Sequence, residues 1–160
     1  MQRGFSLIEL IVVMAIFSII SVVILANHSR FDSQVLLNSL AYNIALTIRE
    51  AQVYGLSVQQ YNNQFQVGYG VHVDAANTEQ YLFFVDTNSN IRYDSGSDSI
   101  LKQYTIGKHH SVSKFCGVRS TGEKQCSDGS TAVTIAELDI VFLRPDPDAL
   151  ISSDQLTNYS

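Results

Sequence analysis

Hydrophobic residues form an almost unbroken run near the start of the chain. Ile11 to Ala26 is apolar apart from Ser18 and Ser21. A helix from Phe5 to Ala26 would be about 33 Å long at about 1.5 Å per residue, which is enough to cross the hydrocarbon core of a bilayer. We therefore predict a membrane-spanning helix over residues 5–26.

After this run, apolar residues recur at helical spacing. One stripe, expected to pack on a globular domain, comprises Leu37, Leu40, Ala41, Ile44, Ile48 and Ala51. A second stripe on the opposite side comprises Val35, Tyr42, Leu46 and Val53. This second stripe is either a contact with neighbouring subunits or a set of ordinary exposed apolar side chains. Gly55 is a natural C-cap after Tyr54, so the pattern predicts one helix over residues 5–54.

From residue 55 onward the pattern favours short β-strands. The expected strands are Phe65–Val73, Gln80–Val85, Ile100–Ile106, Val112–Val118 and Val133–Leu143. In the last of them Val133, Ile135, Leu138, Ile140 and Phe142 are expected to face inward. The polar residues 152–160 are either a flexible tail or a sign that the closing strands are absent from this chain. A helix followed by strands predicts an α+β fold, in which the second half of the helix packs on an antiparallel β domain at residues 55–160.

Charge and motifs exclude several classes of function. The 160-residue chain has a net charge of −5 and scattered basic residues, which argues against a nucleic-acid partner. The early positive charge at Arg3 predicts a cytoplasmic N-terminus and an extracytoplasmic β domain. The sequence contains no HExxH, GxSxG, P-loop or CxxC motif, so we expect neither an enzyme nor a cofactor.

Two cysteines lie ten positions apart in the predicted β domain. Outside the cytoplasm a disulfide between Cys116 and Cys126 would persist and would staple a hairpin around the turn-like Ser120–Glu123. The alternative is two free, buried thiols.

Oxygen-bearing side chains alternate along one short stretch, as they do in calcium-binding loops. These weak candidates for metal ligands are Asp86, Asn88, Asn90 and Asp94. Ile91 stands where such a loop requires a glycine, and Asp and Asn also favour plain turns between strands. The stretch is therefore either a turn or a calcium site. His109 and His110 are adjacent and would face opposite ways on a strand, so they are poor co-ligands. His72 is expected to be an isolated surface or partly buried imidazole.

The hexapeptide Gly4-Phe5-Ser6-Leu7-Ile8-Glu9 resembles the processing site of type IV prepilins and type II secretion pseudopilins. The resemblance implies a leader at residues 1–4, cleavage after Gly4 by a prepilin peptidase, and methylation of the Phe5 amine. It also implies that Glu9 is the family's buried glutamate. An acidic residue in a membrane span costs roughly 2.5–3.5 kcal/mol, so we expect Glu9 to pair with the Phe5 ammonium of an adjacent subunit.

This resemblance implies a structural filament subunit of a type IV pilus or a type II secretion pseudopilus. The segments 83–88 and 139–145 resemble H-type pseudopilins and FimT-like minor pilins. The implied partners are other pilin subunits, the peptidase, the inner-membrane assembly platform and, before assembly, the lipid bilayer. The implied location is the cytoplasmic membrane, followed by a surface or periplasmic filament. The alternative is a membrane-anchored module that binds a ligand or DNA through its β domain without polymerising.

Overall fold

The computed structural model describes residues 6–57, 59–107, 110–155 and 157–159, and it confirms the α+β class. The chain divides into two compact units, Met1–Tyr42 and Asn43–Ser160. Helix α1, Leu7–Leu56, contributes its first part to one unit and its last part to the other. The other elements assigned in the described residues are all β-strands, and they belong to the second unit.

In the first unit, α1 is the only described element. The large apolar side chains between Leu7 and Leu25 are exposed within this unit. A run of this length and composition could not remain uncovered in water at low cost, because each large apolar side chain contributes about 1.5–3 kcal/mol when it is buried. The first unit therefore does not bury this segment by itself, and the segment requires an apolar environment.

In the second unit, six strands form one antiparallel sheet in the order β3-β2-β1-β6-β7-β8. The strands of this sheet are β1 (Gly68–Asp74), β2 (Gln80–Asp86), β3 (Ser99–Thr105), β6 (Glu137–Leu143), β7 (Asp146–Ser153) and β8 (Thr157–Tyr159). A separate two-stranded sheet pairs β4 (Cys116–Val118) with β5 (Lys124–Cys126).

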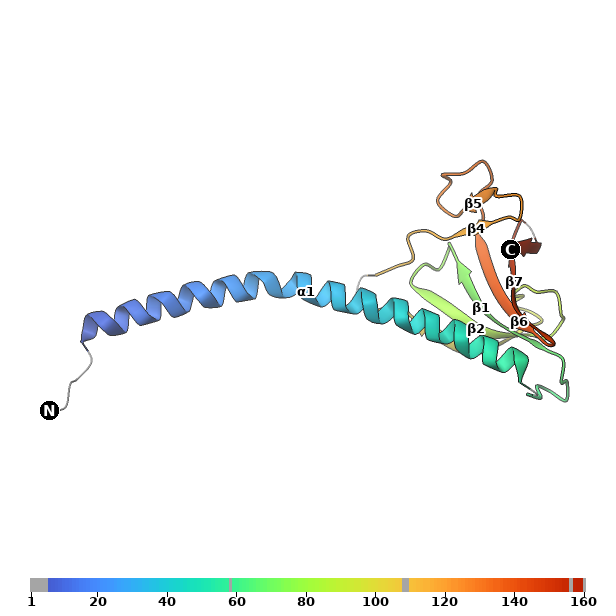
Figure 1. Cartoon of the computed structure of the whole chain (residues 1–160), viewed down its shortest axis with the longest axis horizontal. Coiled ribbons are helices and arrows are strands. Elements are labelled where there is room, and N and C mark those ends of the chain that lie inside the picture. Colours follow the sequence, from blue (N-terminus) through green and yellow to red (C-terminus); the bar gives the residue numbers. More distant parts are fainter. Residues whose placement is uncertain (1–5, 58, 108–109, 156, 160) are drawn as a thin grey trace. The chain divides into compact units, whose positions relative to one another are not determined.

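The last turns of α1 cover one face of the large sheet, as Figure 1 shows for the labelled strands β1 and β2. Tyr54 anchors this contact, with its ring 5.5 Å from that of Tyr69 and 5.6 Å, edge to face, from that of Phe83. Ala51 and Phe83 are fully buried at the interface. Such aromatic pairs add about 0.5–1.5 kcal/mol beyond the area that they bury. This part of the helix is therefore fixed by its own domain.

Gly55 lies inside the helix and not at its end. We predicted that the helix would end at Tyr54 with Gly55 as its C-cap, but α1 continues to Leu56. A Cβ atom at position 55 would lie 2.3 Å from the carbonyl oxygen of Phe142. Glycine is required here because the helix backbone passes directly over strand β6, and no larger residue fits in that space.

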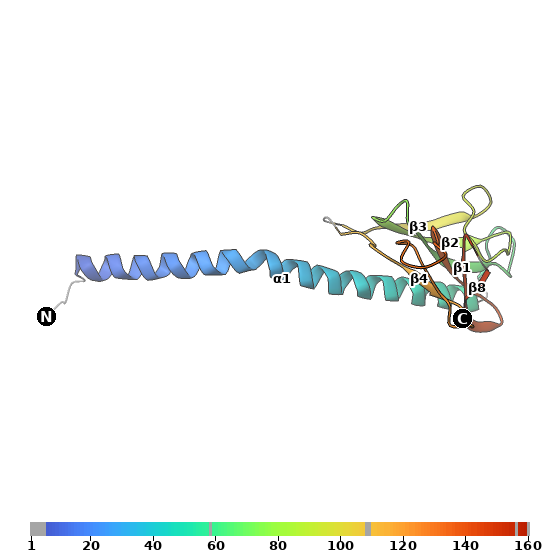
Figure 2. The same ribbon diagram turned by 90° about the horizontal axis from the view of Figure 1, so that it is seen from above.

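The opposite face of the sheet is also covered, although no helix lies there. Figure 2 shows α1 on one side of the strands, with loops on the other side. Phe84 and Val141 point to this second face and are buried together with Asp86 and Asp139. Phe84 lies across Gly70, where a Cβ atom would be 2.9 Å from its ring. The loop between β2 and β3 supplies the covering side chains, including Tyr93.

Several predicted boundaries need correction. Strand β7 was not predicted, because its first residues Asp146, Pro147 and Asp148 are polar or proline. It pairs with β6 from Leu138↔Ser153 to Leu143↔Asp146, so the sheet does have closing strands and residues 152–153 are buried in it. The strand expected at Phe65–Val73 begins only at Gly68, and the strand expected at Val112–Val118 begins only at Cys116.

The predicted faces were also partly wrong. In β6, Phe142 is buried as expected, but so are Asp139 and Val141 on the other face. Ile135 is buried before the strand begins, whereas Val133, Leu138 and Ile140 are only half-buried. On α1, Leu37 and Ala41 of the predicted packing stripe are exposed, whereas Thr47, which was not assigned to that stripe, is buried. Both faces of this sheet are covered, which a simple alternating pattern does not reveal.

Candidate functional site

The N-terminal segment of α1 carries the residues that the sequence singled out for assembly. Gly4 and Phe5 lie outside the described residues. Ser6 precedes the helix, and the backbone N–H of Ser6 donates to Glu9 Oε2 at 3.1 Å. This is the reach-back hydrogen bond of a capping box, in which the residue at the third helical position satisfies the N-terminal amide. The Glu9 carboxylate is thus held at the positive end of the helix, within one turn of Phe5 in the sequence.

The residues that follow Glu9 have the length and composition of a membrane span. Leu7–Leu25 has a mean hydropathy of 2.9 over 19 residues, and it is the one helical stretch in the described chain that is long and apolar enough to cross a membrane. The hydroxyls of Ser18 and Ser21 donate to the carbonyls of Met14 and Phe17, each at 2.8 Å. Because these hydroxyls are hydrogen-bonded to carbonyls of the same helix, the segment remains compatible with lipid. An apolar N-terminal helix of this kind fits a membrane-anchored protein.

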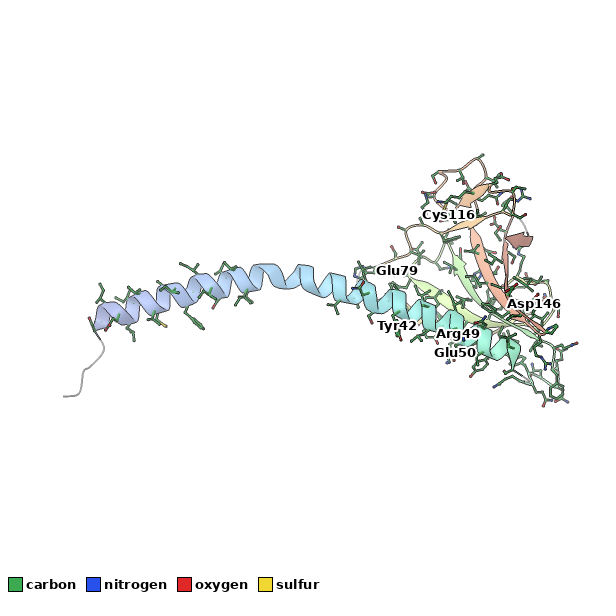
Figure 3. The ribbon with its side chains drawn as sticks, viewed as in Figure 1. Tyr42, Arg49, Glu50, Glu79, Cys116 and Asp146 are labelled. Carbon is green, nitrogen blue, oxygen red and sulfur yellow. A yellow bond between two sulfur atoms is a disulfide. The ribbon has the colours of Figure 1, made fainter. Side chains whose placement is uncertain are left out.

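The second stripe on α1 remains uncovered by the described chain. Its members Val35, Tyr42, Leu46 and Val53 are all about half exposed or more, and Tyr42 is 67% exposed. Figure 3 labels Tyr42 on α1. These side chains can therefore contact another molecule. A role of the stripe in subunit packing stays a prediction.

The disulfide is confirmed. Cys116 and Cys126 lie directly opposite each other in the β4–β5 pair and are joined by an S–S bond. The turn between them is the predicted one, because Gly122 has a φ of +83° and its N–H donates to the Arg119 carbonyl. Figure 3 labels Cys116 in this small sheet. The hairpin has few residues to bury, so the crosslink replaces the hydrophobic core that it lacks.

The loop after β2 uses its oxygens for its own structure. Asp86 accepts the backbone N–H groups of Asn90 at 3.2 Å and Ile91 at 2.9 Å. Asp94 accepts the side-chain amides of Asn88 and Asn90. The candidate ligands are therefore brought together, but as a network of turn hydrogen bonds. Among the described residues, no group of three or more His, Cys, Asp or Glu side chains is arranged to hold a metal ion.

The two acids of this loop have opposite electrostatic surroundings. Burial raises the pKa of Asp86 above its ordinary value, and this effect outweighs the backbone hydrogen bonds that favour the charged form. The amides of Asn88 and Asn90 lower the pKa of Asp94, which lies at the surface. Asp98 completes the loop by accepting the backbone N–H of Thr87 at 2.9 Å and that of Asp94 at 2.8 Å.

His72 is not the isolated imidazole that we expected. It is buried in β1 directly opposite Asp139 in β6, and the distance from His72 Nδ1 to Asp139 Oδ1 is 2.8 Å. The Tyr93 ring lies 4.7 Å from the imidazole ring. The two residues are 67 positions apart in the sequence. Only the register of β1 against β6 brings them together, so local patterns could not have revealed the pair.

His72 lines a cleft of about 590 Å³ on the sheet face opposite α1. The cleft is lined mainly by polar side chains from β1, β2 and β3 and from the loop that contains Arg92 and Tyr93. No local sequence pattern indicates this cleft, because its lining comes from β1, β2, β3, β6 and the loop between β2 and β3.

Comparison with known families gives a match at the N-terminus. Residues 1–25 match the prokaryotic N-terminal methylation motif. This match supports a type IV prepilin-like class for the chain, and proteins of this class are structural subunits and not enzymes. The motif, the apolar helix and the Cys116–Cys126 disulfide agree with a methylated, membrane-anchored pilin-type precursor. Comparison with curated proteins and with solved structures gives no match for this chain.

Proposed function

We propose that this protein is a filament subunit of the type IV pilus or type II secretion pseudopilus class. A peptidase cleaves the precursor after Gly4, the subunit waits in the cytoplasmic membrane, and it then joins a filament through α1. The observation that carries the proposal is the N-terminal methylation motif at residues 1–25, which is followed by an apolar helix whose large side chains are exposed between Leu7 and Leu25.

Glu9 gives this assembly its register. Its hydrogen bond to the Ser6 N–H occupies one carboxylate oxygen, Oε2. The Phe5 ammonium created by cleavage on an adjacent subunit supplies a positive partner for the same carboxylate. In an apolar surrounding such a pair forms only when the two helices have the correct axial offset, because an unpaired charge there costs about 3–5 kcal/mol. The pair thereby favours one packing of neighbouring helices.

A glutamine substitution tests this role without changing the shape of the side chain. Glu9→Gln should insert into the membrane normally but should reduce incorporation into filaments at least tenfold in the native host. Glu79→Gln is the matched control, because Glu79 is an exposed glutamate on the β domain, as labelled in Figure 3. Incorporation of Glu9→Gln at the level of Glu79→Gln would refute the pairing. Mass spectrometry of the mature protein should find methylated Phe5 at its N-terminus, and any other first residue would refute the processing.

The competing function is an anchored module that does not polymerise. Both native cysteines are engaged in the disulfide, so new cysteines on α1 would react without interference. A chain with Tyr42→Cys and Val53→Cys, treated with a bifunctional thiol reagent in native membranes, should give an ordered ladder of multimers if subunits pack through the exposed stripe. Monomers alone would favour the anchored module and the inner-membrane location without a filament.

A further inference from the structure

The cleft on the β domain lies on the sheet face opposite α1, and the filament assembly proposed above does not use it. Strands β1, β2, β3 and β6 and the loop between β2 and β3 contribute to its lining. Its volume of about 590 Å³ falls within the usual range of small-molecule sites. The chemistry of the lining therefore decides which ligand the cleft can hold.

The loop that lines the cleft is held in a fixed position. Ile91 has a φ of +67°, a left-handed conformation that a β-branched residue rarely adopts. Two hydrogen bonds hold it there: its N–H donates to Asp86 Oδ2, and its carbonyl accepts the hydroxyl of Ser152 from β7. Two residues further on, the Tyr93 ring lies 4.7 Å from that of His72. The cleft is therefore formed before any ligand arrives, which lowers the entropic cost of binding.

The lining carries more negative than positive charge. The carboxylates of Asp74, Asp94 and Glu137 line the cleft together with a single guanidinium, that of Arg92. Arg92 lies 3.5 Å from the Glu137 carboxylate and offsets its charge. Neither Asp74 nor Asp94 forms an ion pair with a basic side chain of the described residues. The cleft therefore presents two carboxylates that lack a basic partner in the described chain.

Two of the acids are direct neighbours across the sheet. Asp74 at the end of β1 is paired with Glu137 at the start of β6. Like charges directly opposite each other destabilise a strand pair. Arg92 does not bridge the two acids, because its terminal nitrogen approaches only Glu137 and its Nε is buried without a hydrogen-bond partner among the described residues. A further cation in the cleft would relieve this repulsion.

The buried His72–Asp139 pair does not offset the acids of the lining. Asp139 is fully buried, and its Oδ1 lies 2.8 Å from His72 Nδ1. Its Oδ2 has no hydrogen-bond partner among the described residues. With Asp139 ionised, the pair is neutral if the ring carries two protons and negative if the ring carries one. In both states the cleft keeps its excess of negative charge.

The two unpaired acids can each accept further hydrogen bonds. Both side-chain amides bound to Asp94 donate to Oδ2, so its Oδ1 accepts no hydrogen bond from the described residues. Each oxygen of Asp74 accepts one N–H, and a carboxylate oxygen has room for a second donor. The amides of Asn88 and Asn90 lower the pKa of Asp94, so this acid is ionised at neutral pH. These uncharged donors position the carboxylates without neutralising them.

We propose that this cleft binds an organic cation with two amino or guanidino groups joined by an apolar chain. A metal ion would need converging ligands, and no group of three His, Cys, Asp or Glu side chains is arranged in that way in the part of the chain that the structure describes. Separate carboxylates suit a ligand whose positive charges are also separate. Its methylene groups match the apolar surface of Leu82 and Ile100 in the same lining. Free polyamines and the basic side chains of a polypeptide share this chemistry.

Saturation-transfer NMR on the full-length chain in nonionic detergent micelles tests this proposal. The cationic probes are putrescine and the acetylated, amidated tripeptide lysine-alanine-lysine, and their neutral counterparts are 1,4-butanediol and the glutamine-alanine-glutamine peptide. At least one cationic probe should bind about tenfold more tightly than its counterpart. Raising NaCl from about 20 mM to about 200 mM should weaken this binding several-fold, because salt screens the attraction. Tighter binding of the diamine assigns the site to a free polyamine, and tighter binding of the peptide assigns it to basic side chains.

A pair of double variants separates the cleft from the charge of the whole domain. Asp74→Asn/Asp94→Asn removes the two unpaired charges without changing side-chain shape and should weaken the cationic probe about tenfold. Asp146→Asn/Asp148→Asn is the matched control, because it removes two charges from exposed positions in β7 that do not line the cleft. Figure 3 labels Asp146 at this site. The control should leave the Kd unchanged.

Four outcomes would overturn the proposal. They are no transfer to either cationic probe, equal binding of the neutral counterparts, a Kd of the unmodified chain that does not depend on salt, and equal Kd values for the two double variants. The salt dependence is measured on the unmodified chain, so it tests the proposal even if the cleft variant does not fold. None of these outcomes bears on filament assembly, which depends on α1 and is measured separately.

Discussion

The apolar side chains in the first and last parts of α1 differ in how they are covered. Between residues 7 and 25 the large apolar side chains are exposed, and Phe17 is 68% exposed. In the last turns Ala51 is fully buried, and the sheet supplies the aromatic partners Tyr69 and Phe83. An exposed apolar stretch of this size marks a contact with lipid or with other proteins. Hydrophobicity alone therefore does not identify a core, because what matters is whether the same chain supplies the partner.

The largest expected effect comes from truncating one phenylalanine in each of the two units. Phe83→Ala should destabilise the β domain by about 3–5 kcal/mol, because Phe83 is 1% exposed and contacts two tyrosine rings. Phe17→Ala removes the same atoms from an exposed position and should leave domain stability unchanged. Urea unfolding of the full chain in detergent micelles, followed by tyrosine fluorescence, measures both changes.

Each variant serves as the control of the other. Phe17→Ala should weaken partitioning into lipid vesicles, whereas Phe83→Ala should not. Equal losses of domain stability in the two variants would mean that the N-terminal segment contributes to the folded core, and the contrast between the two parts would then be wrong.

The sequence revealed the elements whose patterns are local. The helix was predicted to within two residues at its C-terminal end, and β2 and β3 were predicted to within one residue at each end. Strand β7 was missed because its apolar residues begin only at Ala149, after Asp146, Pro147 and Asp148. Its place in the sheet depends on pairing with β6, which is a tertiary property. A local pattern therefore predicted an element only where its apolar residues repeat with the period of a helix or a strand.

The candidate sites also divide into those that a local sequence pattern predicts and those that depend on tertiary pairing. Glu9 and the two cysteines could be found from short motifs and spacing. The His72–Asp139 pair and the cleft beside it could not, because β1, β2, β3, β6 and the loop between β2 and β3 each contribute only one or a few side chains to them. A sequence pattern carries no information on which residues meet across a sheet unless the register is already known.

The next effect concerns the close approach of α1 to the sheet. Gly55→Ala should destabilise the β domain by about 1–3 kcal/mol, because the new methyl group would meet the backbone of Phe142 and the helix would have to move. Gly96→Ala is the control, since a Cβ atom at that position meets nothing within 4 Å. Membrane partitioning should be unaffected in both. Equal urea midpoints for Gly55→Ala and Gly96→Ala would mean that the contact between the end of α1 and β6 does not stabilise the β domain.

The smallest expected effect compares one carboxylate from each of the two units, Glu9 and Asp86. Both accept backbone N–H groups, but only Asp86 is buried by the protein. Because burial raises the pKa of Asp86 above 3.8, the folded chain holds this proton more tightly than the unfolded chain does. The resulting stabilisation is complete below pH 3.8 and is lost as the pH rises through the higher folded pKa.

Asp86→Asn removes this titration and weakens one backbone hydrogen bond, so at pH 3 the variant should be about 1 kcal/mol less stable than the wild type. As the pH rises to 7 the wild type must bury a charge that the variant lacks, and the difference should therefore shrink. Glu9→Gln should leave the urea midpoint of the β domain unchanged at both pH values, because its carboxylate lies outside that domain. A difference for Asp86→Asn that grew with pH would instead mean that the backbone hydrogen bonds outweigh burial, and the pKa of Asp86 would then lie below its ordinary value.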